Sequence, residues 1–127
     1  TFDDTYRDVP SLSGLIRRAA VVVLPYDSRD QVTSGVLVDA IAAGRPVVAT
    51  AFPHAVELLS TGAGIVVPHA NPAALAYALR RVLTEPDLAD EMAGEARRIA
   101  PTLGWQAVAH RYSSLAGRVV APIGARA

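Results

Sequence analysis

Three short, largely apolar runs recur along this chain. They are AVVVLP from Ala20 to Pro25, PVVAT from Pro46 to Thr50 and AGIVVP from Ala63 to Pro68. Runs this short, rich in β-branched residues and without polar alternation, are typical of strands buried on both faces, as in parallel sheets. Segments with helical spacing of apolar residues separate them. The alternation predicts an α/β fold, a Rossmann-like parallel sheet with flanking helices.

Most of the predicted helices carry a start or stop signal as well as an apolar stripe. The clearest runs from Thr33 to Ala43, where Gly44 provides a left-handed cap and Pro46 follows. Prolines occupy first-turn positions in several of the others. The remaining helices are expected over VPSLSGLIRRA from Val9, over HAVELLS from His54, from Asn71 and Pro72 onwards, and from Pro86 to Ile99.

A final helix is predicted after Gly104. Apolar residues recur there at intervals of three and four, which is the spacing of one helix face. The stripe consists of Trp105, Val108, Tyr112, Leu115 and Val119. We expect Trp105 and Tyr112 to anchor this helix in the core.

The charge balance and the missing residue types exclude several classes of function. Twelve basic residues, all of them arginine, equal twelve acidic ones, so no positive surplus predicts a nucleic acid partner. Without lysine the chain cannot form a Schiff base, and without cysteine it has no thiol nucleophile, disulfide or cysteine-bound zinc. His54, His69 and His110 lack metal-ligand spacing and are expected in loops or at the surface. We therefore expect no metal and no cofactor.

Two further features bear on context. No apolar run approaches the roughly 20 residues that span a bilayer, and no signal-peptide pattern opens the chain, so a cytoplasmic protein is expected. The chain starts at Thr1, and three strands are few for a doubly wound sheet. We therefore expect it to be a piece of a larger protein.

The polar loop before the helix at Thr33 is the candidate binding site. Ligands of parallel sheets bind beyond the carboxyl ends of the strands, where helix N-termini present free N–H groups. Gly35 would let a ligand approach the backbone, and Thr33 and Ser34 offer hydroxyls. A diphosphate suits such a place. The alternative is that Thr33 or Ser34 merely caps the helix, which is the commoner use of these residues.

The order of these motifs resembles the C-terminal donor-binding half of GT-B-fold retaining glycosyltransferases of the group 1, or family 4, type. The resemblance rests on LPY at the first strand's end, Ser34-Gly35, Asp39, AAGRPVVAT, Glu57 and GAGIVV. It implies the C-terminal half of a GT-B fold, with residues 1–120 forming a nucleotide-sugar-binding domain. It also implies that the last helix crosses back towards an N-terminal domain. From the sequence itself, residues 121–127 are expected to form a loose tail.

The resemblance also implies the site. The family shows an acid that bonds hydroxyls of the donor sugar and, eight positions later, a second acid that binds the ribose. Asp39 takes the second position, whereas Gln31 stands at the first and Asp30 is its alternative. Gln31 can still form hydrogen bonds but supplies no charge. The implied donor-binding residues are Gln31, Val32, Thr33, Ser34, Gly35, Val36 and Asp39, with no catalytic residue in this chain.

The implied function is retaining glycosyl transfer from a nucleotide-diphosphate sugar. The acceptor would bind an N-terminal domain of the same polypeptide, and the family's diphosphate clamp would lie upstream, so the chain alone is expected to be inactive. An uncovered sheet edge predicts that it can self-associate. The alternative is a non-catalytic α/β binding or receiver-like regulatory module, with VVVLPYDS ending near a phospho-aspartate. The absence of lysine counts against that alternative.

Overall fold

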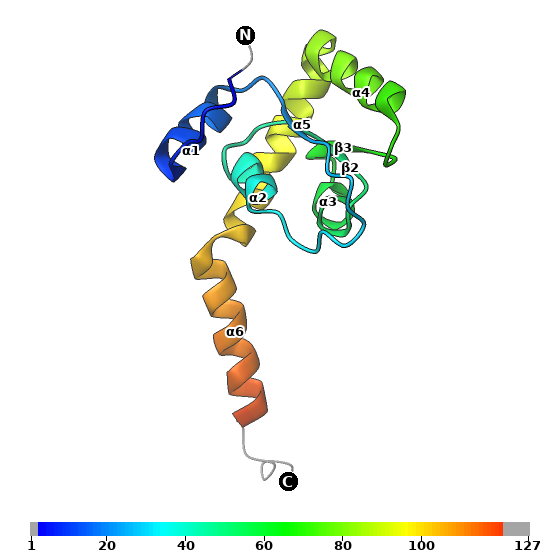
Figure 1. Ribbon diagram of the computed structural model, residues 1–127. Coiled ribbons are helices and arrows are strands. Elements are labelled where there is room, and N and C mark those ends of the chain that lie inside the picture. Colours follow the sequence, from blue (N-terminus) through cyan, green and yellow to red (C-terminus); the bar gives the residue numbers. More distant parts are fainter. Residues whose placement is uncertain (1–2, 121–127) are drawn as a thin grey trace.

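The computed structural model describes residues 3–120 as a small α/β unit with one parallel sheet (Figure 1). The predicted tail, residues 121–127, lies outside the described residues. In chain order the elements are α1 (Val9–Arg18), β1 (Val22–Leu24), α2 (Gly35–Ala42), β2 (Val47–Thr50), α3 (Pro53–Leu59), β3 (Gly64–Val67), α4 (Pro72–Thr84), α5 (Pro86–Ile99), the 3-10 turn η1 (Ala100–Leu103) and α6 (Trp105–Val120). The predicted Rossmann-like alternation of strands and helices is confirmed.

The sheet has the strand order β1-β2-β3, and both pairs of neighbours are parallel. Val47 of β2 is paired with Val22 of β1 and with Gly64 of β3. Since all strands point the same way, their carboxyl ends lie at one edge of the sheet. The segments that follow Leu24, Thr50 and Val67 therefore meet there.

Two hydrophobic clusters pack against opposite faces of the sheet. Val47 and Ala49 of β2 belong to the larger cluster and Val48 to the smaller one, because consecutive strand side chains point to opposite faces. Helices α1, α2 and α3 contribute to the larger cluster and α4 to the smaller one. Helix α5 contributes to both, through Ala96 and Met92 respectively. Strand β2 is consequently buried along its whole length, as its apolar run predicts.

Caps and prolines mark the helix starts that the sequence predicts. Ser34 caps α2, where its Oγ accepts the N–H of Leu37 at 3.2 Å, and Asn71 caps α4, where its Oδ1 accepts the N–H of Ala74 at 2.9 Å. Prolines stand in the first positions of α3, α4 and α5. After α2, Gly44 has a φ of 64°, so the predicted left-handed cap is confirmed.

The prediction that Trp105 and Tyr112 anchor the core is wrong. Trp105 is 88% exposed and Tyr112 is 70% exposed, and no residue of α6 is buried. Figure 1 shows the reason, since α6 extends away from the sheet. Of its apolar stripe, only Trp105 and Val108, in the first part of the helix, lie near the rest of the unit. The stripe forms as predicted, but the described part of the chain does not cover it.

Among residues 3–120, no helix combines the length and the apolar character that crossing a bilayer requires.

Candidate functional site

Ser34, the last residue of the loop between β1 and α2, forms hydrogen bonds through both its side chain and its backbone N–H. Its side chain accepts the N–H of Leu37, and its own backbone N–H donates to Nδ1 of His54 at 3.0 Å. Ser34 is almost fully buried as a result. Because it occupies the N-cap position, α2 begins at Gly35 rather than at Thr33 as the sequence suggested. The capping role weighed in the sequence analysis is therefore real.

Two backbone N–H groups remain unpaired at this helix start. Within residues 3–120, no hydrogen bond is found for the N–H of Gly35 or of Val36, which are the first two residues of α2. Such groups, together with the helix dipole, favour an anion. A Cβ placed on Gly35 would meet no atom within 4 Å, so the space beside this backbone is open.

A cavity of about 530 Å³ opens beside the start of α2. It is lined by Thr33, Ser34, Gly35, Val38 and Asp39, by His54 of α3, by Leu103 of η1, and by Trp105 and Val108 of α6. Asp39 is exposed and is the only acidic or basic side chain besides His54 in this lining. Four of the seven predicted donor-binding residues thus surround one cavity, and they bring hydroxyls, the unpaired N–H of Gly35 and a carboxylate together.

The other three predicted residues do not line this cavity. The Gln31 side chain is turned back on its own loop, where Nε2 donates to the carbonyl oxygen of Thr33 at 2.6 Å. Val32 is 72% exposed, and the side chain of Val36 packs against the larger hydrophobic cluster. Asp30, the alternative to Gln31, is exposed, and its N–H donates to Oγ of Ser28 at 3.3 Å.

Sequence reasoning missed two histidines at this edge of the sheet. His54 accepts the Ser34 N–H, and Nδ1 of His69 lies 3.1 Å from the carbonyl oxygen of Tyr26. Both follow a strand by a few residues, and such segments converge in a parallel sheet. That position, rather than ligand spacing, is the signal that could have identified them. Among residues 3–120, no group of three His, Asp or Glu side chains is placed to hold a metal ion.

Glu57, which the resemblance also matched, does not line the cavity beside α2. It is exposed in the middle of α3 and lines a smaller cavity with His54, Thr61 and Leu103. It is the fifth residue of α3 and lies beyond the first turn of this helix, which contains no acidic residue.

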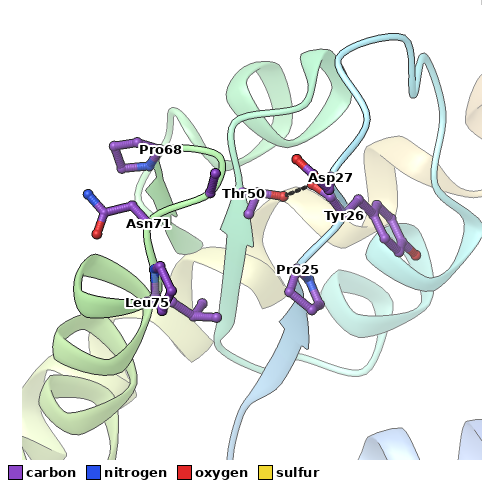
Figure 2. Close-up of a pocket in the computed structure, with 9 residues that line it drawn as sticks. Pro25, Tyr26, Asp27, Thr50, Pro68, Asn71 and Leu75 are labelled. Carbon is purple, nitrogen blue, oxygen red and sulfur yellow. Dashed lines mark hydrogen bonds between the residues drawn. The ribbon is translucent and has the colours of Figure 1, made fainter.

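A third cavity, of about 230 Å³, lies where all three strands end (Figure 2). Its lining is mostly apolar and consists of Pro25, Tyr26, Asp27, Thr50, Pro68, Ala70, Asn71, Pro72 and Leu75. The hydroxyl of Thr50 is already used here, because it donates to the carbonyl oxygen of Tyr26 at 2.6 Å (Figure 2). Asn71 caps α4. This cavity therefore offers fewer free polar groups than the one beside α2.

The comparisons with known proteins agree with this architecture. A model of the family "Glycosyl transferases group 1" matches residues 5–85, which is more than half of the chain. Among solved structures, sucrose-phosphate synthase from Thermosynechococcus elongatus matches with a TM-score of 0.78 and 28% sequence identity. The match covers 95% of this chain and 30% of that one, so the chain spans under a third of that protein's length. No curated protein matched in a sequence search.

The family match runs from α1 to α4 and includes all three strands. It contains the α2 and α3 residues that line the cavity beside α2, but not Leu103, Trp105 and Val108. The structural match extends over nearly the whole chain and identifies the fold as part of a GT-B glycosyltransferase. The chain belongs to the glycosyl transferases group 1 family.

Proposed function

We propose that this chain is the donor-binding part of a retaining glycosyltransferase and that a nucleotide-diphosphate sugar binds in the cavity beside α2. The observation that carries the proposal is the gathering of Thr33, Ser34, Gly35 and Asp39 around one cavity, at a helix start with two unpaired N–H groups. In this proposal residues 1–120 form the donor domain, and the whole enzyme works in the cytoplasm.

Each group has a role that follows from its chemistry. The N–H groups of Gly35 and Val36 would donate to the diphosphate, whose charge the positive end of the α2 dipole favours. The exposed Asp39 carboxylate would accept hydrogen bonds from the ribose hydroxyls. Gln31 lies on the loop outside the lining of this cavity, and its Nε2 is engaged by Thr33, so it would bond, through Oε1, hydroxyls of a sugar that extends towards the loop.

The reaction itself would proceed with retention at the anomeric carbon. Negative charge develops on the departing nucleoside diphosphate, and fixed backbone donors stabilise such charge without reorganising. No arginine lines the cavity beside α2 or the one in Figure 2. The positive clamp for the diphosphate and the acceptor pocket would therefore come from an N-terminal domain or a segment upstream of this chain.

Two substitutions in the full-length enzyme test the proposal. We expect Asp39→Ala to weaken binding of the sugar-free nucleoside diphosphate by about 1–3 kcal/mol, the range for losing a hydrogen bond to a charged group. Gln31→Ala should weaken binding of the intact donor only. Isothermal titration calorimetry with UDP, GDP and ADP, and then with their sugars, measures both.

Asp90→Ala is a matched control, because Asp90 is an exposed aspartate at the fifth position of α5, as Asp39 is at the fifth position of α2. It should leave binding unchanged. Equal losses for Asp39→Ala and Gln31→Ala with the sugar-free nucleotide would contradict the assignment.

Family membership argues against the receiver-like alternative. Asp27, the carboxylate that would be phosphorylated in such a module, lines the cavity of Figure 2 together with Thr50. NMR titration with acetyl phosphate, alongside nucleotide sugars, separates the two functions. Shifts around Asp27 with acetyl phosphate, and none around Gly35 with any nucleotide sugar, would favour the regulatory module.

A further inference from the structure

The loop of residues 25–34 is held at both ends by histidines from other segments. At its start the carbonyl oxygen of Tyr26 bonds to Nδ1 of His69, which follows β3. At its end the N–H of Ser34 donates to Nδ1 of His54, in the first turn of α3. The hydroxyls of Tyr26 and Ser34 lie 3.4 Å apart and link the two ends. This loop leads directly into the cavity beside α2.

The two bonds require opposite tautomers of the two rings. A backbone N–H can only donate, so Nδ1 of His54 must present a lone pair, and the neutral ring carries its proton on Nε2. A carbonyl oxygen can only accept, so Nδ1 of His69 must carry a proton. The bond at His54 therefore exists only when that ring is neutral, whereas the bond at His69 is compatible with either protonation state.

We propose that His54 is a positioning residue, whose neutral imidazole fixes the first turn of α2 by holding the N–H of Ser34. This inference rests on the proposed function as far as the ligand is concerned. Because the bond removes Ser34 from the set of free donors, it directs an incoming diphosphate to the N–H groups of Gly35 and Val36. His54 itself lines the same cavity, so its protonation state affects the place where the ligand would bind.

Protonation of His54 reverses this arrangement. The protonated ring carries hydrogen on Nδ1 as well, and this hydrogen would face the Ser34 N–H, donor against donor. A ring protonated on both nitrogens can no longer accept the Ser34 N–H, so this end of the loop would be released. The titratable side chains that share a cavity or bonded neighbour with His54 are Asp39, Glu57 and, through Ser34, Tyr26. Neither η1 nor α6 adds a charged residue to these linings.

NMR on the isotope-labelled 127-residue chain tests the assignment without any ligand. Ring ¹⁵N shifts should report the Nε2–H tautomer for His54 and the Nδ1–H tautomer for His69 at neutral pH. The Ser34 amide resonance should shift on acidification with the same midpoint as the His54 ring. A proton on His54 Nδ1 at neutral pH, or a Ser34 amide that does not follow the ring, would overturn the proposal.

Binding of UDP, GDP and ADP then tests the consequence for the ligand. We expect His54→Leu to weaken binding about 5- to 10-fold, as for the loss of one hydrogen bond. His54→Asn should retain most of the affinity and lose the acid sensitivity, because Asn Oδ1 can accept the same N–H but does not titrate. His110→Leu, on exposed α6, is the control and should change nothing.

The NMR experiment and the nucleotide-binding experiment test different claims, so their negative results can be told apart. Wild-type chain and full-length enzyme that bind none of the three nucleotides would defeat the proposed function, while the ring tautomers and the Ser34 titration still decide the role of His54. If nucleotides bind and His54→Leu binds them as tightly as the wild type, His54 does not position the site.

Discussion

At the scale of single residues, Gly35 contributes two features to the proposed binding site, open space beside its backbone and an unpaired N–H. Substitutions at this position can test the two features separately. We expect Gly35→Ala to fold normally, since its Cβ would meet no atom within 4 Å and its φ is not positive. The added methyl should nevertheless obstruct a ligand close to the backbone and weaken nucleotide-sugar binding at least severalfold. Calorimetry and thermal unfolding of the same samples measure the two effects.

Gly35→Pro removes the N–H instead of filling the space. Proline suits the first position of a helix, and Ser34 before it has the extended conformation that proline requires, with φ −137° and ψ 113°. We expect a folded protein that binds more weakly. Gly117→Ala in α6, where a Cβ also meets nothing, is the control for both variants. Unchanged affinity in both Gly35→Ala and Gly35→Pro would show that the diphosphate does not bind at this helix start.

At the scale of elements, α6 behaves as an appendage of the folded unit. We expect Trp105→Ala and Tyr112→Ala each to change the free energy of unfolding by less than about 0.5 kcal/mol, as for other exposed positions. Phe52→Ala is the contrasting variant. Phe52 is fully buried and precedes α3 directly in the sequence, so this substitution should lower the free energy of unfolding by about 3–5 kcal/mol. Urea denaturation measures all three. A large loss for Trp105→Ala would show that the ring supports the core.

The same elements show how much of the structure could be predicted from the sequence. Continuous apolar runs predicted all three strands, and the Gly44 signal predicted the end of α2, because those features depend on neighbouring residues. The stripe of α6 predicted a helix with a partner but not whether that partner lies within this chain. The bond between His54 and Ser34 spans twenty positions, so no local pattern could reveal it. The hydrogen bond from the Gln31 side chain to the carbonyl oxygen of Thr33 could not be predicted either, since it depends on the path of the loop.

At the scale of the whole molecule, the chain is expected to bind a nucleotide weakly and to transfer no sugar. It spans 30% of the length of the sucrose-phosphate synthase that it resembles, and no arginine lines the cavity beside α2 or the one in Figure 2. An assay with radiolabelled donors and a panel of acceptors, on the purified 127-residue chain, measures this. Transfer above the rate of a Gly35→Pro control would show that the chain contains a complete active site.

The isolated chain is also expected to self-associate. Within residues 3–120, β1 and β3 each have an unpaired edge, and the apolar stripe of α6 is uncovered. Light scattering should give a mass that rises with protein concentration. A Trp105→Ser/Tyr112→Ser double variant identifies the surface, because it should abolish association through α6 and leave association through the sheet edge intact. A constant monomer mass over the range would contradict the expectation.

The two unpaired N–H groups at the start of α2 belong to the main chain, and this makes one end of the cavity robust to mutation. Every substitution except proline leaves both donors in place, whereas the Asp39 carboxylate disappears with almost any change. Genetic drift can therefore replace the residue at position 36 while the donor geometry persists, whereas position 35 must also remain small enough to admit the ligand. Among related chains, the path of the backbone into this helix will report a retained anion site more faithfully than the residue types found there.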